Sequence, residues 1–273
     1  MKLFNTNFFR RLQVAVVGIP IIGVILVVGS VPLFLFISLL AIVSLFEISK
    51  MLNHANVRLF PTLFVPLNIS IIYLVSQVQS FSQSFVLFGT MIVLITTILI
   101  IYFYSVHLNR FLKNISITVI ATILISVPLS FAILIYQLPQ GALLLATIIF
   151  GVFSFDTGAY IFGNLLGKNK MAPVISPNKT WEGAFFGTII CFITVGILDM
   201  IFDLHIDIFV VIVMACIITV FGQIGDFAES YFKRRMKSKD SSKLLPGHGG
   251  FLDRIDSIVI VLPAVYYWVL LWV

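Results

Sequence analysis

Long apolar segments joined by short polar connections are the feature that most constrains the fold of this chain. A helix that crosses a membrane needs roughly 20 apolar residues, and continuous apolar runs lack the alternation of a transmembrane β-barrel. The sequence therefore predicts an all-α, polytopic integral membrane protein with about nine transmembrane helices. The expected segments are 13–29, 31–48, 59–76, 85–105, 115–136, 141–162, 183–202, 207–225 and 257–273.

The composition excludes an ordinary soluble domain. Hydrophobic residues make up 60% of the chain and charged residues 10%, whereas soluble domains carry about 25% charged residues. Cys191 and Cys216 lie inside apolar segments, so we expect neither a disulfide framework nor a zinc site. Basic residues before the first apolar segment resemble a signal peptide, but no small-residue cleavage pattern follows, and we expect a retained helix. The net charge of +6 fits anionic lipid and phosphate partners and does not require a nucleic acid.

Basic residues occur in alternate connections only. By the positive-inside rule these connections are cytoplasmic, which predicts a cytoplasmic N-terminus, an outside C-terminus and a multi-pass protein of the cell's inner (cytoplasmic) membrane. The turn at 29–32 is very tight, so the first two segments could instead form a re-entrant hairpin. The basic connections hold Lys2, Arg10 and Arg11; Lys50 and Arg58; Arg110 and Lys113; Lys168, Lys170 and Lys179; and the seven from Lys233 to Arg254.

Acidic residues are distributed unevenly along the chain. Glu47 is the only one between residues 1 and 155, and the other ten lie in 156–256. We therefore expect residues 1–140 to form an N-terminal transmembrane scaffold with lipid-facing helices. Residues 141–273 are expected to form the C-terminal catalytic region, with its site on the cytoplasmic side.

Asp156 lies within the sixth apolar segment. A charged carboxylate near hydrocarbon costs several kcal/mol by most estimates and indicates a functional site. The alternative is a structural ion pair with a basic residue of the following connection. That connection, 167–183, contains Ser176, Lys179, Thr180 and Glu182 just before a helix start. Hydroxyls, backbone N–H groups and a lysine at such a position suit phosphate oxygens, although a capped, basic interfacial loop would also explain them.

Two pairs of carboxylates flank a basic stretch near the end of the chain. Asp226 and Glu229 are three residues apart on the eighth helix, and Asp253 and Asp256 are three apart at the start of the ninth. Converging carboxylates beside substrate phosphates are suited to Mg²⁺. An ordinary cytoplasmic loop explains the basic residues but not these pairs, nor the glycine turn at 246–250. The basic residues between the pairs are Lys233, Arg234, Arg235, Lys237, Lys239 and Lys243.

Three blocks of the second half resemble the phosphatidate cytidylyltransferase (CDP-diacylglycerol synthase) family. Residues 230–256 contain Ser, Lys-Arg, Lys-Asp, Pro-Gly, His-Gly-Gly and Asp-Arg-x-Asp at the spacing of the family signature. Residues 176–183 and 156–160 are similar to two further blocks. Asn164 departs from the pattern, since a basic residue is expected after Phe-Gly, which puts one phosphate contact in doubt.

The resemblance implies a reaction of CTP with phosphatidate that gives CDP-diacylglycerol and pyrophosphate. It also implies Mg²⁺ and a second cation such as K⁺, and a homodimer in the bilayer. The catalytic residues would be Asp226, Asp253, Lys233 and Arg254. The residues expected to bind nucleotide or phosphate are Ser176, Lys179, Thr180, Lys233, Arg234, Lys239, His248, Gly249 and Gly250. The metal ligands would be Asp226 and Asp253, with Asp256, Glu229 and Asp156 as secondary groups.

Several rival functions remain at this point. A CTP-dependent polyprenol or dolichol kinase resembles this family in its nucleotide region, but would release CDP. CDP-alcohol phosphotransferases require an Asp-Gly-x-x-Ala-Arg pattern that the sequence lacks. A transporter would show interrupted helices in two related halves, whereas the unusual residues here lie in one half. A non-catalytic lipid-binding protein would not need the two carboxylate pairs.

Overall fold

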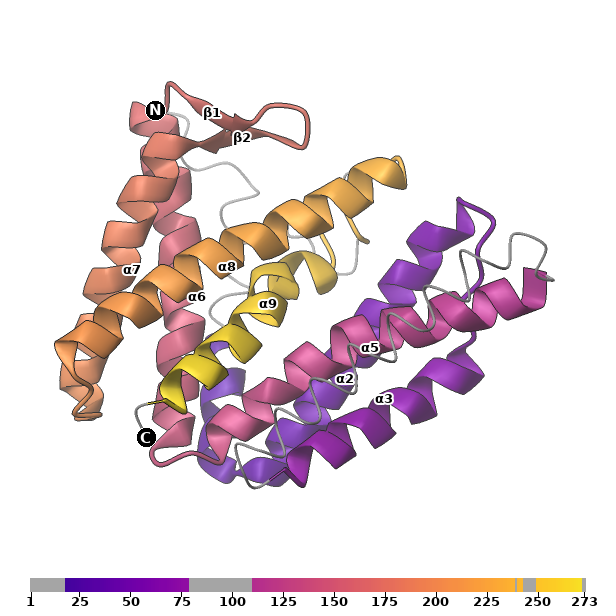
Figure 1. The fold of residues 1–273 in the computed structure, drawn as a ribbon, viewed down its shortest axis with the longest axis horizontal. Coiled ribbons are helices and arrows are strands. Elements are labelled where there is room, and N and C mark those ends of the chain that lie inside the picture. Colours follow the sequence, from indigo (N-terminus) through magenta and orange to yellow (C-terminus); the bar gives the residue numbers. More distant parts are fainter. Residues whose placement is uncertain (1–17, 79–109, 239, 243–248, 272–273) are drawn as a thin grey trace. The chain divides into compact units, whose positions relative to one another are not determined.

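The computed structural model describes residues 18–78, 110–238, 240–242 and 249–271. The predicted fourth segment, 85–105, lies outside the described residues, as does the start of the first. Nearly all the described elements are helices, drawn in Figure 1. They are Gly18–Val28, α2 (Ser30–Asn53), α3 (Pro61–Ser76), α5 (Arg110–Tyr136), α6 (Gly141–Leu166), α7 (Trp181–Phe202), α8 (Ile208–Arg235) and α9 (Leu252–Val269), with strands β1 (Lys170–Ala172) and β2 (Ser176–Thr180).

Five of the described helices are long and apolar enough to cross a membrane: α2, α5, α6, α7 and α8. This confirms the prediction of an all-α, multi-pass membrane protein. Helices Gly18–Val28 and α3 are shorter, and the number of nine spans and the orientation of the termini stay predictions. Large apolar side chains remain exposed on these helices, such as Leu35 on α2 and Phe185 on α7, as expected of surfaces that face lipid.

Gly29 separates the first described helix from α2. Its φ of 127° lies in a region that residues with a Cβ rarely adopt. The chain therefore leaves one helix and enters the next within a single residue, in agreement with the tight turn expected from the sequence.

The chain folds into two compact units. The first contains residues 1–134 and 240–252, and the second contains residues 135–239 and 253–273. The described residues 240–242 and 249–252 thus pack with the N-terminal helices, whereas the sequence analysis grouped them with the C-terminal region. The scaffold and catalytic roles assigned to 1–140 and 141–273 stay predictions.

In the first unit, buried polar contacts join α2, α3 and α5. The Asn68 amide nitrogen donates to the backbone oxygen of Ser38 over 3.2 Å, and the Ser126 hydroxyl donates to the Asn68 side-chain oxygen over 2.6 Å. Asn68 is completely buried. The ring of Phe46 on α2 packs edge to face against the ring of Phe64 on α3. Hydrogen bonds between helices satisfy polar groups that lipid cannot, and therefore fix how the helices pack.

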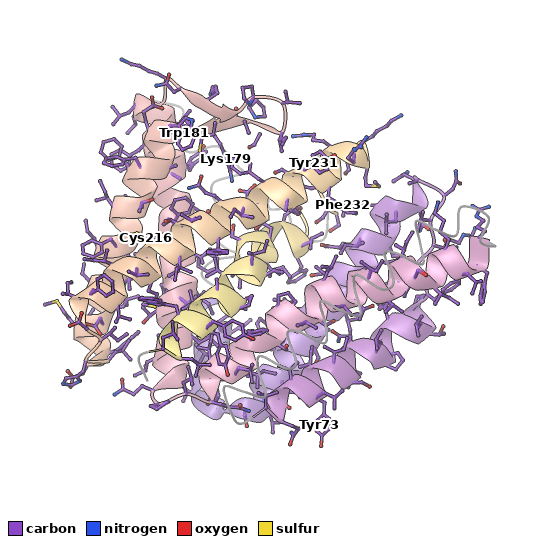
Figure 2. All side chains as sticks on the ribbon, in the orientation of Figure 1. Tyr73, Lys179, Trp181, Cys216, Tyr231 and Phe232 are labelled. Carbon is purple, nitrogen blue, oxygen red and sulfur yellow. The ribbon has the colours of Figure 1, made fainter. Side chains whose placement is uncertain are left out.

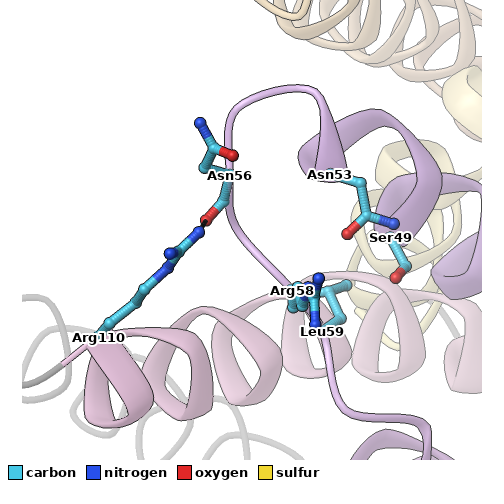
Figure 3. A pocket seen from close by; sticks show the side chains of 6 residues that line it. All are labelled: Ser49, Asn53, Asn56, Arg58, Leu59 and Arg110. Atoms are coloured by element: carbon cyan, nitrogen blue, oxygen red, sulfur yellow. Dashed lines mark hydrogen bonds between the residues drawn. The ribbon is translucent and has the colours of Figure 1, made fainter.

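The first unit also has a polar pocket of about 380 Å³ (Figure 3). The Arg110 guanidinium donates to the backbone oxygen of Asn56 over 3.1 Å at its edge. Asn53, Asn56, Arg58 and Arg110 are exposed, so the pocket is basic but open to solvent. Its lining consists of Ser49, Asn53, Asn56, Arg58, Leu59 and Arg110.

In the second unit, α6 and α7 pack closely as an antiparallel pair, joined by the β1–β2 hairpin. The crossing depends on glycines: a Cβ on Gly187 would lie 2.9 Å from the Phe155 oxygen and 3.0 Å from the Ala159 nitrogen. A Cβ on Gly183 would lie 2.6 Å from the Ala159 oxygen. Small residues at such a crossing let two backbones approach, as in other membrane helix pairs.

Helix α9 packs along α8 in the same unit. The Trp268 indole donates to the Val210 oxygen over 3.3 Å, and a Cβ on Gly225 would collide with the backbone of Asp256. The first contact joins the end of α9 to the start of α8, and the second joins the start of α9 to the later part of α8, so the two helices are antiparallel. The C-terminal end of α8 and the start of α9 therefore lie together.

Replacing Gly187 by leucine is expected to destabilise the protein by about 1 to 3 kcal/mol, because the side chain would force α6 and α7 apart. Equilibrium unfolding in mixed detergent micelles measures this change. Gly196→Leu is the matched control on the same helix, since nothing lies within 4 Å of a Cβ there. Equal stability losses in the two variants would contradict the close-packing account.

Candidate functional site

An ion pair joins the β-hairpin to α8 in the second unit. The Lys179 ammonium lies 2.6 Å from Asp226 Oδ2, with the two side chains 25% and 28% exposed. Figure 2 shows Lys179 at the end of β2, next to Trp181 at the start of α7. The Lys179 ammonium also lies 4.4 Å from the ring centre of Phe227, and the Ser230 hydroxyl donates to Asp226 Oδ1 over 3.2 Å. This pair is open enough for a ligand to reach both charges.

A second, more deeply buried ion cluster joins α8 to α9. The Lys233 ammonium lies 2.6 Å from Glu229 Oε2 and 2.6 Å from Asp253 Oδ1. The three side chains are only 12%, 7% and 8% exposed, respectively. Lys233 therefore holds one member of each predicted carboxylate pair, and removing its charge would take this ion pair away from two buried carboxylates.

Asp156 and Asp256 complete the concentration of charge. Asp156 interacts electrostatically with Asp256, Asp226, Lys179 and Arg254. Burial first, and then the negative charge of Asp226, raise the pKa of Asp256 above its ordinary value, although its oxygen accepts a hydrogen bond from the Ser257 N–H over 2.7 Å. The carboxylates here outnumber the nearby cations, so the site favours additional positive charge.

The connection before α7 forms an antiparallel hairpin, which the sequence did not predict. Strand β1 pairs with β2 in the register Lys170↔Thr180 and Ala172↔Ser176. Glu182 closes the base of the hairpin: its carboxylate accepts hydrogen bonds from the backbone N–H groups of Lys168 and Asn169 and from the Asn169 amide. Because Lys179 is part of β2, the hairpin holds its ammonium next to Asp226.

Thr180 serves as the N-cap of α7. Its buried hydroxyl accepts a hydrogen bond from the Gly183 N–H over 3.2 Å, which satisfies one of the free donors at a helix start. The structure thus gives Thr180 and Glu182 positions that support the hairpin. Phosphate binding by Thr180 and Ser176 stays a prediction.

The remaining predicted residues are placed as follows. Lys239 and His248 lie outside the described residues. Gly249 and Gly250 belong to the first unit, and Arg234 is exposed at the C-terminal end of α8. Glu47, also in the first unit, accepts hydrogen bonds from the N–H groups of Phe251 and Leu252, which directly follow these glycines. The sequence analysis did not predict these contacts. The one feature of the sequence that sets Glu47 apart is that it is the sole carboxylate between residues 1 and 155.

The carboxylates suit a hard cation by their chemistry. Among the described residues, no group of three or more His, Cys, Asp or Glu side chains is arranged to hold a metal ion. Mg²⁺ does not need such a group, because it is usually held by one or two carboxylates, several waters and substrate phosphates. The excess of negative charge around Asp226 and Asp256 fits an ion of this kind.

Comparison with known proteins decides the family. The sequence matches the profile of the cytidylyltransferase family over residues 9–272. This chain belongs to the cytidylyltransferase family. Among its cytidylyltransferase relatives, a phosphatidate cytidylyltransferase of Staphylococcus epidermidis is 40% identical over 258 residues, covering 93% of this chain and 95% of the relative. A phosphatidate cytidylyltransferase of Staphylococcus haemolyticus is 38% identical over 258 residues, again covering 93% of this chain and 95% of the relative. One of Staphylococcus aureus is 50% identical over 109 residues, which cover 40% of this chain and 42% of the relative.

The resemblance predicted from three sequence blocks is thereby confirmed as family membership. The match extends through residues 9–150, where the sequence blocks gave only length and hydropathy. Both compact units therefore belong to one cytidylyltransferase chain, and the lysine–carboxylate clusters of the second unit are its candidate active site.

Proposed function

We propose that this chain transfers the cytidylyl group of CTP to phosphatidate, giving CDP-diacylglycerol and pyrophosphate in phospholipid biosynthesis. The observation that carries the proposal is the similarity to phosphatidate cytidylyltransferases along nearly the full length of both chains. The paired lysines and carboxylates at one end of the second unit supply charges of the kind that this reaction needs.

In this reaction a phosphate oxygen of phosphatidate attacks the α-phosphorus of CTP, and the bond from that phosphorus to the bridging oxygen breaks as pyrophosphate leaves. The attacking oxygen is already anionic at neutral pH, so no strong general base is required. The main barrier is to bring two polyanions together and to stabilise the charge of the leaving group. Positioning and fixed positive charge are therefore the expected means of catalysis.

Lys179 and Lys233 are the residues that we assign to the phosphates. Lys179 is partly exposed and is held by one carboxylate, so it can turn to a triphosphate while remaining near Asp226. Lys233 is held by two carboxylates and keeps a fixed position at the junction of α8 and α9. Arg254, which acts electrostatically on Asp156, adds positive charge beside them.

Asp226 and Asp253 are the residues that would hold Mg²⁺, with Asp256, Glu229 and Asp156 as secondary groups. When bound, the ion neutralises phosphate charge and orients the triphosphate. The family's substrates place the reaction at the surface of a bilayer. We further propose that the protein lies in the cytoplasmic membrane with this site facing the cytoplasm, where the positive-inside rule places the basic connections.

The test is release of pyrophosphate from CTP by purified protein in detergent micelles with Mg²⁺. We expect release only when phosphatidate is present, with CDP-diacylglycerol formed in equal amount. Diacylglycerol, which lacks the phosphate nucleophile, is the matched control lipid. Formation of CDP in place of pyrophosphate would instead indicate a CTP-dependent lipid kinase and would contradict the proposal.

A further inference from the structure

Glu47 is a buried carboxylate whose surroundings differ from those of the other acidic residues. It lies on α2 and exposes none of its surface. It takes part in none of the ion pairs between described residues, such as those of Lys179 and Lys233. Burying a charge without a cation is costly unless hydrogen bonds replace the lost water.

Four donors from the segment 241–252 surround this carboxylate within the first unit. Oε1 accepts from the Ser242 hydroxyl over 2.6 Å and from the Phe251 N–H over 3.0 Å. Oε2 accepts from the Ser241 hydroxyl over 3.1 Å and from the Leu252 N–H over 2.8 Å. Both ends of the segment are thereby tied to one side chain of α2.

The arrangement requires a carboxylate in particular. Two oxygens offer about four acceptor positions, and each of them meets a donor here. Glutamine at position 47 would be nearly the same size, but its NH₂ group would face a hydroxyl and a backbone N–H that also donates. Hydrogen bonds to an ionised group are roughly twice as strong as those between neutral groups, so the glutamate holds the segment more firmly.

Gly250 lies directly against this carboxylate. A Cβ on Gly250 would lie 2.5 Å from both Glu47 oxygens. Gly249 has a φ of 80°, which favours glycine. The two glycines therefore let the backbone approach Glu47 closely enough for the N–H groups of Phe251 and Leu252 to reach it.

Leu252 is the first residue of α9, and Asp253 follows it. Glu47 thus supplies an acceptor and a negative charge to the start of α9, as a capping residue would, but from a different helix. We propose that Glu47 is a positioning residue for cytidylyl transfer, which fixes the Gly249–Gly250 turn and the start of α9 ahead of Asp253. This inference rests on the proposed function, because it assigns Glu47 to that reaction.

The competing explanation is that Glu47 contributes only to folding. Asn68 provides the comparison, because it is also completely buried in the first unit and makes two side-chain hydrogen bonds between helices. Its partners in these bonds are Ser38 and Ser126, which lie on α2 and α5 and not in the described segment 249–252. Asn68→Leu should lower stability without displacing the segment 249–252. The two explanations therefore predict different activities for a Glu47 variant and an Asn68 variant that lose similar amounts of stability.

The experiment compares Glu47→Gln with Asn68→Leu in purified full-length protein, below the thermal transition of both. Steady-state kinetics give kcat and the KM values for CTP and phosphatidate, and hydrogen exchange followed by mass spectrometry reports on peptides that cover 249–256. Glu47→Gln should lower kcat by about 100-fold, as expected when reacting groups move by about 1 Å, and should speed exchange at 251 and 252. Asn68→Leu should lower the transition temperature but change neither kcat nor that exchange.

Glu47→Asp provides a rescue, because it keeps the charge and should recover part of the lost kcat. Normal kcat and normal exchange in Glu47→Gln would overturn the inference, as would an equal loss of kcat in Asn68→Leu. Failure of the wild-type protein to use CTP and phosphatidate would instead overturn the proposed function. In that event, the exchange data would still show whether Glu47 holds the segment.

Discussion

Asp226→Asn is expected to lower the turnover of CTP with phosphatidate by about 10³-fold. The change keeps the size of the side chain but removes the charge that holds Lys179 at 2.6 Å and that faces Asp256. Losing one preorganised electrostatic group from an active site typically costs about 10² to 10³ in rate, and Asp226 would also lose its ability to hold Mg²⁺. Steady-state assays across a range of Mg²⁺ concentrations measure both effects, and the Mg²⁺ requirement should rise.

The matched control is Asp207→Asn on the same helix. Asp207 is the exposed N-cap of α8, and its carboxylate accepts a hydrogen bond from the Phe209 N–H over 2.7 Å. Asparagine caps helices about as well as aspartate, so turnover should stay near the wild-type value. Normal turnover of Asp226→Asn at the normal Mg²⁺ requirement would show that Asp226 has no part in the reaction.

Lys233→Met is expected to destabilise the protein by about 3 to 5 kcal/mol and to abolish turnover. The ammonium lies between Glu229 and Asp253, and all three side chains are largely buried. Removing the cation takes this ion pair away from both carboxylates, and breaking a buried ion pair costs about that much in other proteins. Equilibrium unfolding in mixed detergent micelles gives the stability change.

Lys233→Arg separates charge from shape, because it keeps the positive charge but changes the donor geometry. We expect it to recover most of the stability and only part of the activity. Lys237→Met, at an exposed lysine beyond the end of α8, should have little effect on either. A stability loss in Lys233→Met no larger than in Lys237→Met would contradict the role given to the buried cluster.

The hydropathy of the sequence was sufficient to predict the five described helices that are long and apolar enough to span a membrane, because each of them carries its signal in its own residues. The apolar segment 207–225 nevertheless covers only part of its helix: the sequence analysis extended the helix to Glu229, and α8 continues to Arg235. The polar residues of that extension form helix, and Glu229 and Lys233 are stabilised there as an i, i+4 ion pair. A hydropathy criterion sees only the apolar part of such a helix.

The carboxylate pairs and Lys179 were identified from their spacing, but their partners were not. The spacing assigned Lys179 to phosphate, which stays a prediction, and the structure adds an ion pair with Asp226 of α8 that the spacing did not suggest. Glu47 and Ser242 are 195 residues apart, and no local pattern links a lone glutamate in an apolar segment to a distant glycine turn. The β-hairpin also depends on a contact between residues apart in sequence: the Glu182 carboxylate accepts a hydrogen bond from the backbone N–H of Lys168, 14 residues earlier.

The most direct measurement of the central claim follows the α-phosphorus of CTP. Purified protein is incubated with phosphatidate, Mg²⁺ and CTP that is radiolabelled at either the α- or the γ-phosphorus, and the lipid and aqueous phases are then separated. The proposed function predicts that the α-label enters the lipid phase as CDP-diacylglycerol, while the γ-label stays in water as pyrophosphate. Transfer of the γ-label to lipid, or of neither label, would contradict the account.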